Sequence, residues 1–267
     1  SKRLMQAKSR AAAGKPLSAK PAARQKGSTL QQINSRLVSG LREYCGKHGF
    51  EKAVLGLSGG ADSALCAKIA AQALGKKNVL CVFLPSPYTS KKSEMLAKKA
   101  AKKTGARLIT IPIGNAYSSC LGTLKPHIKK RSKPSRTEQN IQARIRANVL
   151  YALSNEHGYL VLNTSNKSEL MVGYGTLHGD LAGGYSVISD VPKTLVLKLC
   201  KHLGLPREIM ERAPTAELAP GQKDSDDLPP YGKLDRVLGL LERGEGKKGI
   251  AKKAKVPLSL VEKILRR

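Results

Sequence analysis

The chain has 267 residues, and 48 lysines and arginines against 19 acidic residues give it a formal net charge of +29. This length can bury a substantial core, and the lack of an 18-residue apolar stretch argues against a membrane span. The charge predicts a polyanionic partner, such as nucleotide phosphates or nucleic acid, without indicating a fold or a chemistry. Five scattered cysteines without a C-x-x-C pair argue against a disulfide scaffold or zinc ribbon and suit a reducing cytoplasm.

Residues 1–28 are predicted to form a disordered basic tail. Residues 1–30 hold eight lysines and arginines and no acid, and their Ala, Ser, Gly and Pro content cannot form a core. They also lack the apolar run of a secretory signal, so a cytoplasmic location is expected. The globular domain is expected over residues 29–267.

Apolar periodicity predicts strands that alternate with helices along the rest of the chain. Strands are expected at 53–57, 79–84, 107–113 and 159–162. Helices are expected at 29–48, 61–74, 90–104, 137–156, 193–203, 231–242 and 257–266. In the Lys-rich helix 90–104, Met95 and Leu96 are expected to face inward. This alternation predicts an α/β fold with an open parallel sheet flanked by helices, whose ligands bind at the carboxyl ends of the strands.

A glycine-rich loop, Ser58-Gly59-Gly60-Ala61-Asp62-Ser63, follows the first strand and opens a helix. Such a helix start presents unpaired N–H groups and the positive end of the helix dipole to a phosphate. A carboxylate beside phosphates would repel them unless a cation lay between, so Asp62 predicts Mg²⁺. The alternative interpretation is a tight strand-to-helix turn in which Asp62 only caps the helix.

Further polar residues follow the fourth predicted strand, at the same edge of the sheet. Thr164 can hydrogen-bond a nucleotide, and Glu169 is placed to be a second carboxylate on the metal, unless it is simply an exposed acid at a helix start. A glycine-rich loop at 173–184 carries Asp180 and is poor core material, so it is expected to lie over a site.

Two later segments carry further signals. Lys193 begins a helix, where the dipole favours acids, so an anion nearby would explain it. The Pro- and Asp-rich segment 214–230 is interpreted as either a functional lid or a flexible connector. Lys247 to Arg267 could be a small helix-turn-helix, although a helical pair packed against the domain is the favoured interpretation.

The loop resembles that of the N-type ATP pyrophosphatases, and the motifs in order resemble an NAD synthetase from about Thr29 to Leu241. The resemblance is nearest to the synthetase domain of the glutamine-dependent enzymes. The matching stretches are LGLSGGADS (55–63), LPSPYTS (84–90), NIQARIRANVLY (140–151), NTSNKSELMVGYGTLHGD (163–180), SDVPKTL (189–195) and PTAELAPGQKDSDDLPPY (214–231). It implies a Rossmann-like fold of the adenine nucleotide alpha hydrolase type. It also implies that ATP adenylates deamido-NAD and that ammonia converts the adenylate to NAD and AMP.

The resemblance also implies roles for individual residues. ATP would be bound by Ser58, Gly59, Gly60, Asp62, Ser63, Thr164, Lys193 and Thr215. Mg²⁺ would be bound by Asp62 and Glu169, and deamido-NAD by Asn140, Arg144 and Glu169. Asp180 would orient or deprotonate the incoming ammonium, which makes Asp62, Asp180 and Lys193 the candidate catalytic residues.

Three features bear on the partners. No glutaminase domain occurs in the sequence, so free ammonia or a separate glutaminase is expected as the nitrogen source. Leu177 stands where ammonia-dependent members carry Lys. The family usually continues past the last helix into a basic segment that holds deamido-NAD, whereas this sequence stops at Arg266-Arg267. Family members are homodimers, so a homodimer is expected.

Two alternatives remain open. Another N-type ATP pyrophosphatase, such as a GMP synthetase or a tRNA-modifying sulfurtransferase, would share the loop. The net charge favours tRNA, but such sulfurtransferases commonly use paired cysteines, and Cys66 and Cys81 show no such arrangement. A non-enzymatic nucleic-acid binder would also suit the charge but would not need Asp62, so nucleic acid is not the expected partner.

Overall fold

The computed structural model describes residues 29–129, 133–222 and 227–266, so the predicted tail 1–28 lies outside the described residues. In this part of the chain five parallel strands form one sheet in the order β3-β2-β1-β4-β5. Their bounds are β1 Lys52–Gly56, β2 Val79–Phe83, β3 Arg107–Thr110, β4 Tyr159–Asn163 and β5 Tyr185–Ser186. The predicted open parallel sheet is confirmed, and β5 adds a short edge strand that the sequence did not predict.

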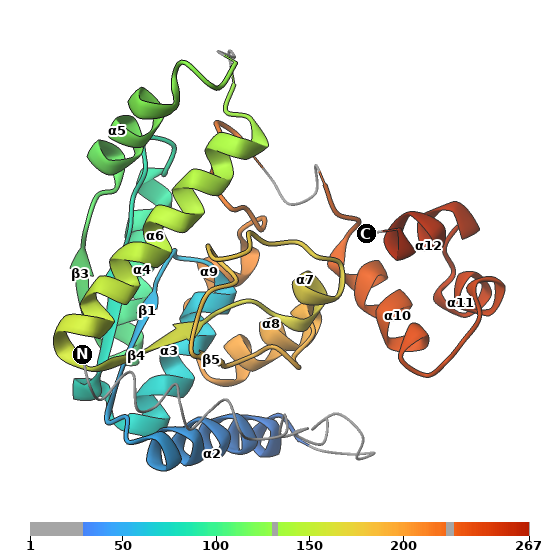
Figure 1. Ribbon diagram of the computed structural model, residues 1–267. Coiled ribbons are helices and arrows are strands. Elements are labelled where there is room, and N and C mark those ends of the chain that lie inside the picture. The colour runs from blue at the N-terminus through green and yellow to red at the C-terminus, as the bar shows by residue number, and fades with distance from the viewer. Residues whose placement is uncertain (1–28, 130–132, 223–226, 267) are drawn as a thin grey trace.

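The helices cover both faces of this sheet (Figure 1). They are α2 Leu30–His48, α3 Ala61–Leu74, α4 Lys91–Thr104, α5 Gly114–Leu124, α6 Arg136–His157, α7 Lys167–Met171, α8 Lys193–His202, α9 Arg207–Glu211, α10 Tyr231–Leu241, α11 Lys247–Ala254 and α12 Leu258–Leu265, with a 3-10 turn at Lys76–Asn78. No helix of the described residues is both long and apolar enough to cross a membrane.

The sequence of the central strand β1 is apolar from Ala53 to Gly56 because both faces of the strand are covered. Ala53 and Leu55 belong to the main core, which also includes buried residues of α2, α3, α4 and α8. Val54 points to the opposite face, where it packs with residues of α6. Because successive side chains of a strand alternate between faces, a strand covered on both sides must be apolar throughout.

A second apolar cluster lies at the end of the chain, where α10, α11 and α12 pack together (Figure 1). Ile250, Val261 and Ile264 are buried in it, and Val172, which follows α7, joins it. The last segment thus forms the helical pair of the favoured interpretation, which packs on α10, and α10 in turn contacts α7 and α8. The apolar faces of both helices are used within this cluster.

One prediction of side-chain orientation is wrong. Leu96 of α4 is fully buried, whereas the neighbouring Met95 is 45% exposed. Successive residues of a helix point about 100° apart, and Met95 falls outside the buried face that Leu96 and Ala97 share. The exposed face of α4 carries its lysines, and Met95 lies among them.

Candidate active site

The glycine-rich loop connects β1 to α3 as expected and is held by hydrogen bonds within itself. The Ser58 and Ser63 hydroxyls lie 3.2 Å apart, Gly60 N–H donates to Ser58 Oγ at 3.3 Å, and Ser63 Oγ donates to the Gly60 carbonyl. Gly60 caps α3 without a side-chain hydrogen bond. The N–H groups of the first turn can therefore bind an anion, as at other helix N-termini.

Gly59 has a structural role that its predicted ATP contact does not capture. Its φ of +82° lies in the left-handed region, and a Cβ added there would lie 2.5 Å from the carbonyl oxygen of Ser93 in α4. Only glycine fits such a conformation and so close an approach. Gly59 is buried against α4, whereas its neighbours Ser58 and Gly60 face the cavity.

A cavity of about 780 Å³ opens at the carboxyl ends of β1 and β4, where the loop lies. Its wall brings together most of the site residues that the sequence predicted, from segments far apart in the chain. These are Ser58, Gly60, Asp62, Ser63, Asn140, Thr164, Glu169, Asp180, Lys193 and Thr215. The volume and the mixed polar and apolar wall are typical of a small-molecule site.

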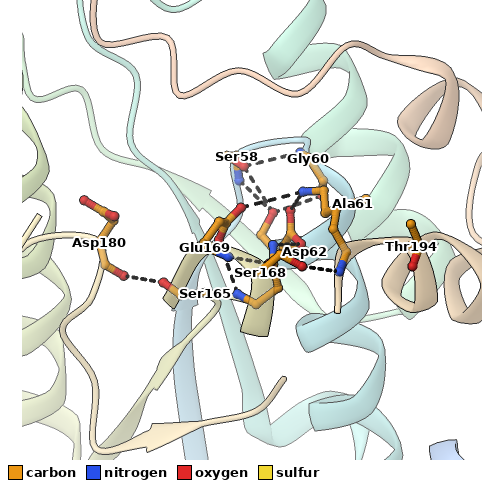
Figure 2. Close-up of polar contacts among 12 residues, drawn as sticks. Ser58, Gly60, Ala61, Asp62, Ser165, Ser168, Glu169, Asp180 and Thr194 are labelled. Atoms are coloured by element: carbon orange, nitrogen blue, oxygen red, sulfur yellow. Dashed lines mark hydrogen bonds and ion pairs between the residues drawn. The ribbon is translucent and has the colours of Figure 1, made fainter. Parts of the chain in front are cut away.

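Two carboxylates and a lysine meet beside the loop, and we call Asp62, Glu169 and Lys193 the carboxylate–lysine cluster. Lys193 Nζ forms an ion pair with Asp62 Oδ2 and lies 3.8 Å from Glu169 Oε1. The Lys193 side chain is 5% exposed, so the two carboxylates balance a charge that is largely removed from solvent. Figure 2 shows Asp62 and Glu169 together beside the loop, with Asp180 set apart from them.

Asn166, which the sequence analysis did not single out, holds both carboxylates of the cluster. Its Nδ2 donates to Asp62 Oδ1 at 2.9 Å, and its Oδ1 accepts the N–H of Glu169 at 3.1 Å. Glu169 Oε2 accepts the Asn166 N–H in return, which completes a capping box for α7. Glu169 is thus a capping acid through one oxygen, and its other oxygen faces Lys193.

The position of Lys193 at the start of α8 is explained by the anions around it. Besides Asp62 and Glu169, the carboxylate of Asp235 lies at this helix end and accepts the Thr194 N–H at 2.8 Å. Three carboxylates therefore surround a helix start that has a lysine as its first residue. The expectation of a nearby anion is confirmed, and the anions belong to the protein itself.

Asp180 lies in the glycine-rich loop that covers the cavity. It is held by the Thr176 N–H, which donates to Asp180 Oδ1 at 3.0 Å, while Thr176 Oγ1 donates to Asn140 Oδ1. Gly179 packs so closely on α6 that a Cβ would lie 2.8 Å from that of Ala143. Asp180 is exposed towards the cavity, but the protein around its carboxyl desolvates it and raises its pKa, while its hydrogen bonds with Thr176 oppose the shift. The carboxyl is thus a better proton acceptor than an ordinary aspartate.

Helix α6 presents Asn140 and Arg146 to the cavity, but Arg144 lies outside its wall. The exposed Arg144 donates through Nε to the Leu177 carbonyl at 3.2 Å. Arg146 donates to the Leu84 carbonyl at 3.0 Å, and burial lowers its pKa to about 10, so it stays cationic at neutral pH. The proposed contact of Arg144 with a nucleotide stays a prediction, and Arg146 is a cavity cation that sequence reasoning missed.

The segment that carries Thr215 is fixed by Glu217, whose backbone has a positive φ of 48°. Glu217 accepts hydrogen bonds from Ser90 Oγ at 2.7 Å and Ser93 Oγ at 2.5 Å, and it pairs with Arg212 at 2.6 Å. The Glu217 N–H donates to Thr215 Oγ1 at 3.2 Å. The described part of the predicted lid thus rests on the start of α4, while residues 223–226 lie outside the described residues.

Comparison with known proteins identifies the family of this chain. A family model described as NAD synthase matches residues 33–267. The chain belongs to the NAD synthase family. The glutamine-dependent NAD(+) synthetase of Thermotoga maritima is 49% identical over 231 residues, which cover 84% of this chain and 40% of that protein. The chain therefore spans less than half the length of this relative.

Two solved structures share the fold of this chain. An NMN synthetase from Francisella tularensis has a TM-score of 0.78 at 28% identity, with 89% of this chain and 92% of that one covered. An NH3-dependent NAD synthetase from Campylobacter jejuni has a TM-score of 0.74 at 27% identity, with 90% and 93% covered. The Rossmann-like fold that the sequence motifs implied is thus shown.

The donor set of the carboxylate–lysine cluster fits Mg²⁺. Within the described residues no group of three or more His, Cys, Asp and Glu side chains is arranged so that it could hold a metal ion by itself. Mg²⁺ commonly takes only one or two carboxylates and completes its shell with phosphate and water oxygens. Asp62 and Glu169 supply that number of hard oxygen donors, next to a loop suited to phosphate.

Proposed function

We propose that this chain amidates deamido-NAD with ATP and ammonia, through an adenylated intermediate, and releases NAD, AMP and pyrophosphate. One observation carries the proposal. A phosphate-type loop, a pair of carboxylates and a buried lysine converge on one cavity, in a chain of the NAD synthase family. This combination suits attack on the α-phosphate of ATP with departure of pyrophosphate.

The chemistry needs two steps. An oxygen of the nicotinate carboxylate attacks the α-phosphorus, the bond to the β-phosphate oxygen breaks, and pyrophosphate departs. Ammonia then attacks the acyl carbon, loses a proton, and AMP leaves with the former carboxylate oxygen. The N–H groups at the start of α3 and the Lys193 ammonium would stabilise negative charge on the phosphates. Bound Mg²⁺, held by Asp62 and Glu169, would supply further neutralisation of that charge.

Other residues would bind and position the substrates. Ser58, Ser63, Thr164 and Thr215 would bind ATP, and Asn140 and Glu169 would bind deamido-NAD, since all six line the cavity. The raised pKa of Asp180 suits a group that orients ammonium and accepts its proton. Holding the reactants in line would provide much of the rate, since positioning alone can contribute several kcal/mol.

The nitrogen source and assembly are also proposals. Relatives such as the Thermotoga maritima protein are named glutamine-dependent, which favours a glutaminase as the partner that supplies ammonia. We propose that free ammonia also serves, as the name of the Campylobacter jejuni enzyme indicates for that protein. A cytoplasmic homodimer is the expected state of the enzyme.

The burial of three cysteine thiols argues against the alternative of a cysteine-dependent tRNA sulfurtransferase. Cys66, Cys81 and Cys200 are buried. Burial raises the pKa of Cys81 and Cys200 to about 12, and raises that of Cys66 strongly. A nucleophilic cysteine needs a thiolate near neutral pH, which these positions do not favour.

The deciding experiment incubates the full chain with deamido-NAD, MgATP and ammonium and follows NAD and AMP. We expect both products in equal amounts, and none when ATP is omitted. Deamido-NMN, run in parallel, tests the mononucleotide substrate that the Francisella tularensis name suggests. Formation of neither NAD nor AMP from deamido-NAD would overturn the proposal.

A further inference from the structure

One face of α10 contacts the carboxylate–lysine cluster from outside the cavity. Tyr231 and Asp235 are four residues apart, so they lie on the same side of this helix. Lys193 Nζ lies 5.3 Å from the centre of the Tyr231 ring, within cation–π range. Neither Tyr231 nor Asp235 belongs to the cavity wall. The helix therefore supports the cluster from behind.

Both carboxylate oxygens of Asp235 accept hydrogen bonds from residues around Lys193. Its Oδ2 accepts the Thr194 N–H at 2.8 Å, and its Oδ1 accepts the Ser168 hydroxyl at 2.5 Å. Ser168, which is fully buried, accepts the Lys193 N–H at 2.9 Å through the same oxygen. Asp235 therefore binds the first two N–H groups of α8, that of Thr194 directly and that of Lys193 through the Ser168 hydroxyl.

This arrangement replaces an ordinary helix cap. Pro192, the N-cap of α8, makes no side-chain hydrogen bond to the helix. The orphan N–H groups at the helix start therefore take partners from other elements. A carboxylate is the favoured partner at this end of a helix dipole. Asp235 supplies it from a helix more than 40 residues further along the chain.

The hydrogen bonds of Asp235 involve the chain neighbours of both Lys193 and Glu169. Ser168 directly precedes Glu169, and Thr194 directly follows Lys193. We propose that Asp235 is a positioning residue that holds Lys193 and Glu169 against Asp62 without touching a substrate. The inference deepens the proposed function and rests on it, since the cluster is the proposed phosphate and metal site.

A simpler role would be to fasten α10 to the body of the protein, and a neighbouring contact separates the two. Lys167 Nζ pairs with Glu242 Oε1 at 2.5 Å and also joins α7 to α10. It does not involve the start of α8. Glu242→Gln is therefore the matched control, because it removes a contact between the same helices and leaves the Asp235 hydrogen bonds in place.

Steady-state kinetics of the full chain test the proposal. We expect Asp235→Ala to lower kcat by roughly 10- to 100-fold, since small misplacements of reacting groups carry such losses. The KM for deamido-NAD should rise by a smaller factor than kcat falls, and Glu242→Gln should keep near wild-type kcat and KM. Asp235→Asn, which preserves the shape and one acceptor oxygen, should recover part of the lost rate and covers the case in which the alanine variant does not fold.

Amide hydrogen exchange gives a readout that does not depend on any activity. The N–H groups of Lys193 and Thr194 should exchange at least 10-fold faster in Asp235→Ala than in Glu242→Gln. Equal exchange, or equal losses of kcat in both variants, would overturn the positioning role. A wild-type chain inactive with deamido-NAD, combined with the expected exchange difference, would refute the proposed reaction and leave the hydrogen-bonding role of Asp235 standing.

Discussion

The glycine-rich loop 58–63 and the carboxylate–lysine cluster adjoin each other, but one is held by local contacts and the other by contacts between distant segments. The loop is six consecutive residues, and its internal hydrogen bonds join residues no more than five positions apart. The cluster joins Asp62 to Asn166 and Lys193, which are 104 and 131 residues away. The loop depends on local backbone geometry, whereas the cluster depends on how β4, α7, α8 and α10 are packed.

The two regions should therefore fail differently. A change in the loop alters the shape of a short segment and its contact with α4. A change in the cluster leaves a charge without its partner in a place that is poorly solvated, which is more costly than the loss of an exposed ion pair. The predictions below test this contrast.

Asp62 belongs to both regions, so Asp62→Asn should have the largest effect on activity. The amide can still accept the Asn166 hydrogen bond, but it loses the charge that pairs with Lys193 and that we propose binds Mg²⁺. We expect turnover to fall roughly 100- to 1000-fold, the scale reported for removal of one preorganised electrostatic group. The fold, followed by circular dichroism, should remain. Near-normal NAD formation would count against the metal role.

Lys193→Met should lower NAD formation, and it should also lower the free energy of unfolding and change how stability responds to Mg²⁺. Methionine fills the space but leaves Asp62 and Glu169 without the ammonium, at a cost of roughly 3–5 kcal/mol for a buried pair. Because a ligand that binds the folded state stabilises it, MgCl2 should raise the Tm more in this variant than in the wild type.

The control for this prediction is Lys99→Met, which breaks the ion pair with Glu208 on the surface. Its unfolding free energy should change far less than that of Lys193→Met, because exposed ion pairs contribute little, and its Tm should respond to MgCl2 as the wild type does. Identical magnesium responses in all three proteins would contradict a metal site between the two carboxylates.

Gly59→Ala should be more harmful than Gly75→Ala, although both glycines have a positive φ. Gly75 has no atom within 4 Å of an added Cβ, so alanine there meets backbone strain alone, roughly 1 kcal/mol. At Gly59 the contact with the Ser93 carbonyl adds roughly 1–3 kcal/mol of overpacking. Urea unfolding measures the difference, and the KM for ATP should rise only for Gly59→Ala. Equal losses would show that the approach to α4 does not matter.

Glu217→Gln should have the smallest effect of the four. Glutamine keeps one acceptor but weakens the bonds to Ser90, Ser93 and Arg212, so we expect a loss of roughly 1–3 kcal/mol. The side chain of Glu217 anchors the segment that carries Thr215 to the start of α4, so a loosened segment should raise the KM for ATP a few-fold. Glu211→Gln, which breaks the exposed pair with Arg207, should change the unfolding free energy by less than about 0.5 kcal/mol. Matching behaviour of the two variants would refute the link to ATP.

Much of the fold could be predicted because it follows from local patterns. The apolar run 53–57 and the helix 61–74 correspond closely to β1 and α3, since burial on two faces and helical periodicity leave their mark on neighbouring residues. β5 could not be predicted from its two residues, because it exists only by pairing with β4. The third strand ends at Thr110, short of the predicted residue 113, because its partner β2 ends at Phe83. Ile111 and Ile113 still donate backbone hydrogen bonds to Phe83 and Pro85.

The sequence alone was sufficient for the loop, the two carboxylates and the lysine, since motifs carry residue types in order along the chain. It could not indicate that Asn166 joins the carboxylates, that Arg146 and not Arg144 lies in the cavity wall, or that Asp235 caps α8. The bonds of Asn166 and Asp235 join residues that are distant in sequence. Whether Arg144 or Arg146 lines the cavity depends on which face of α6 packs towards it. No local periodicity encodes these relations, because they arise only when separate elements pack against one another.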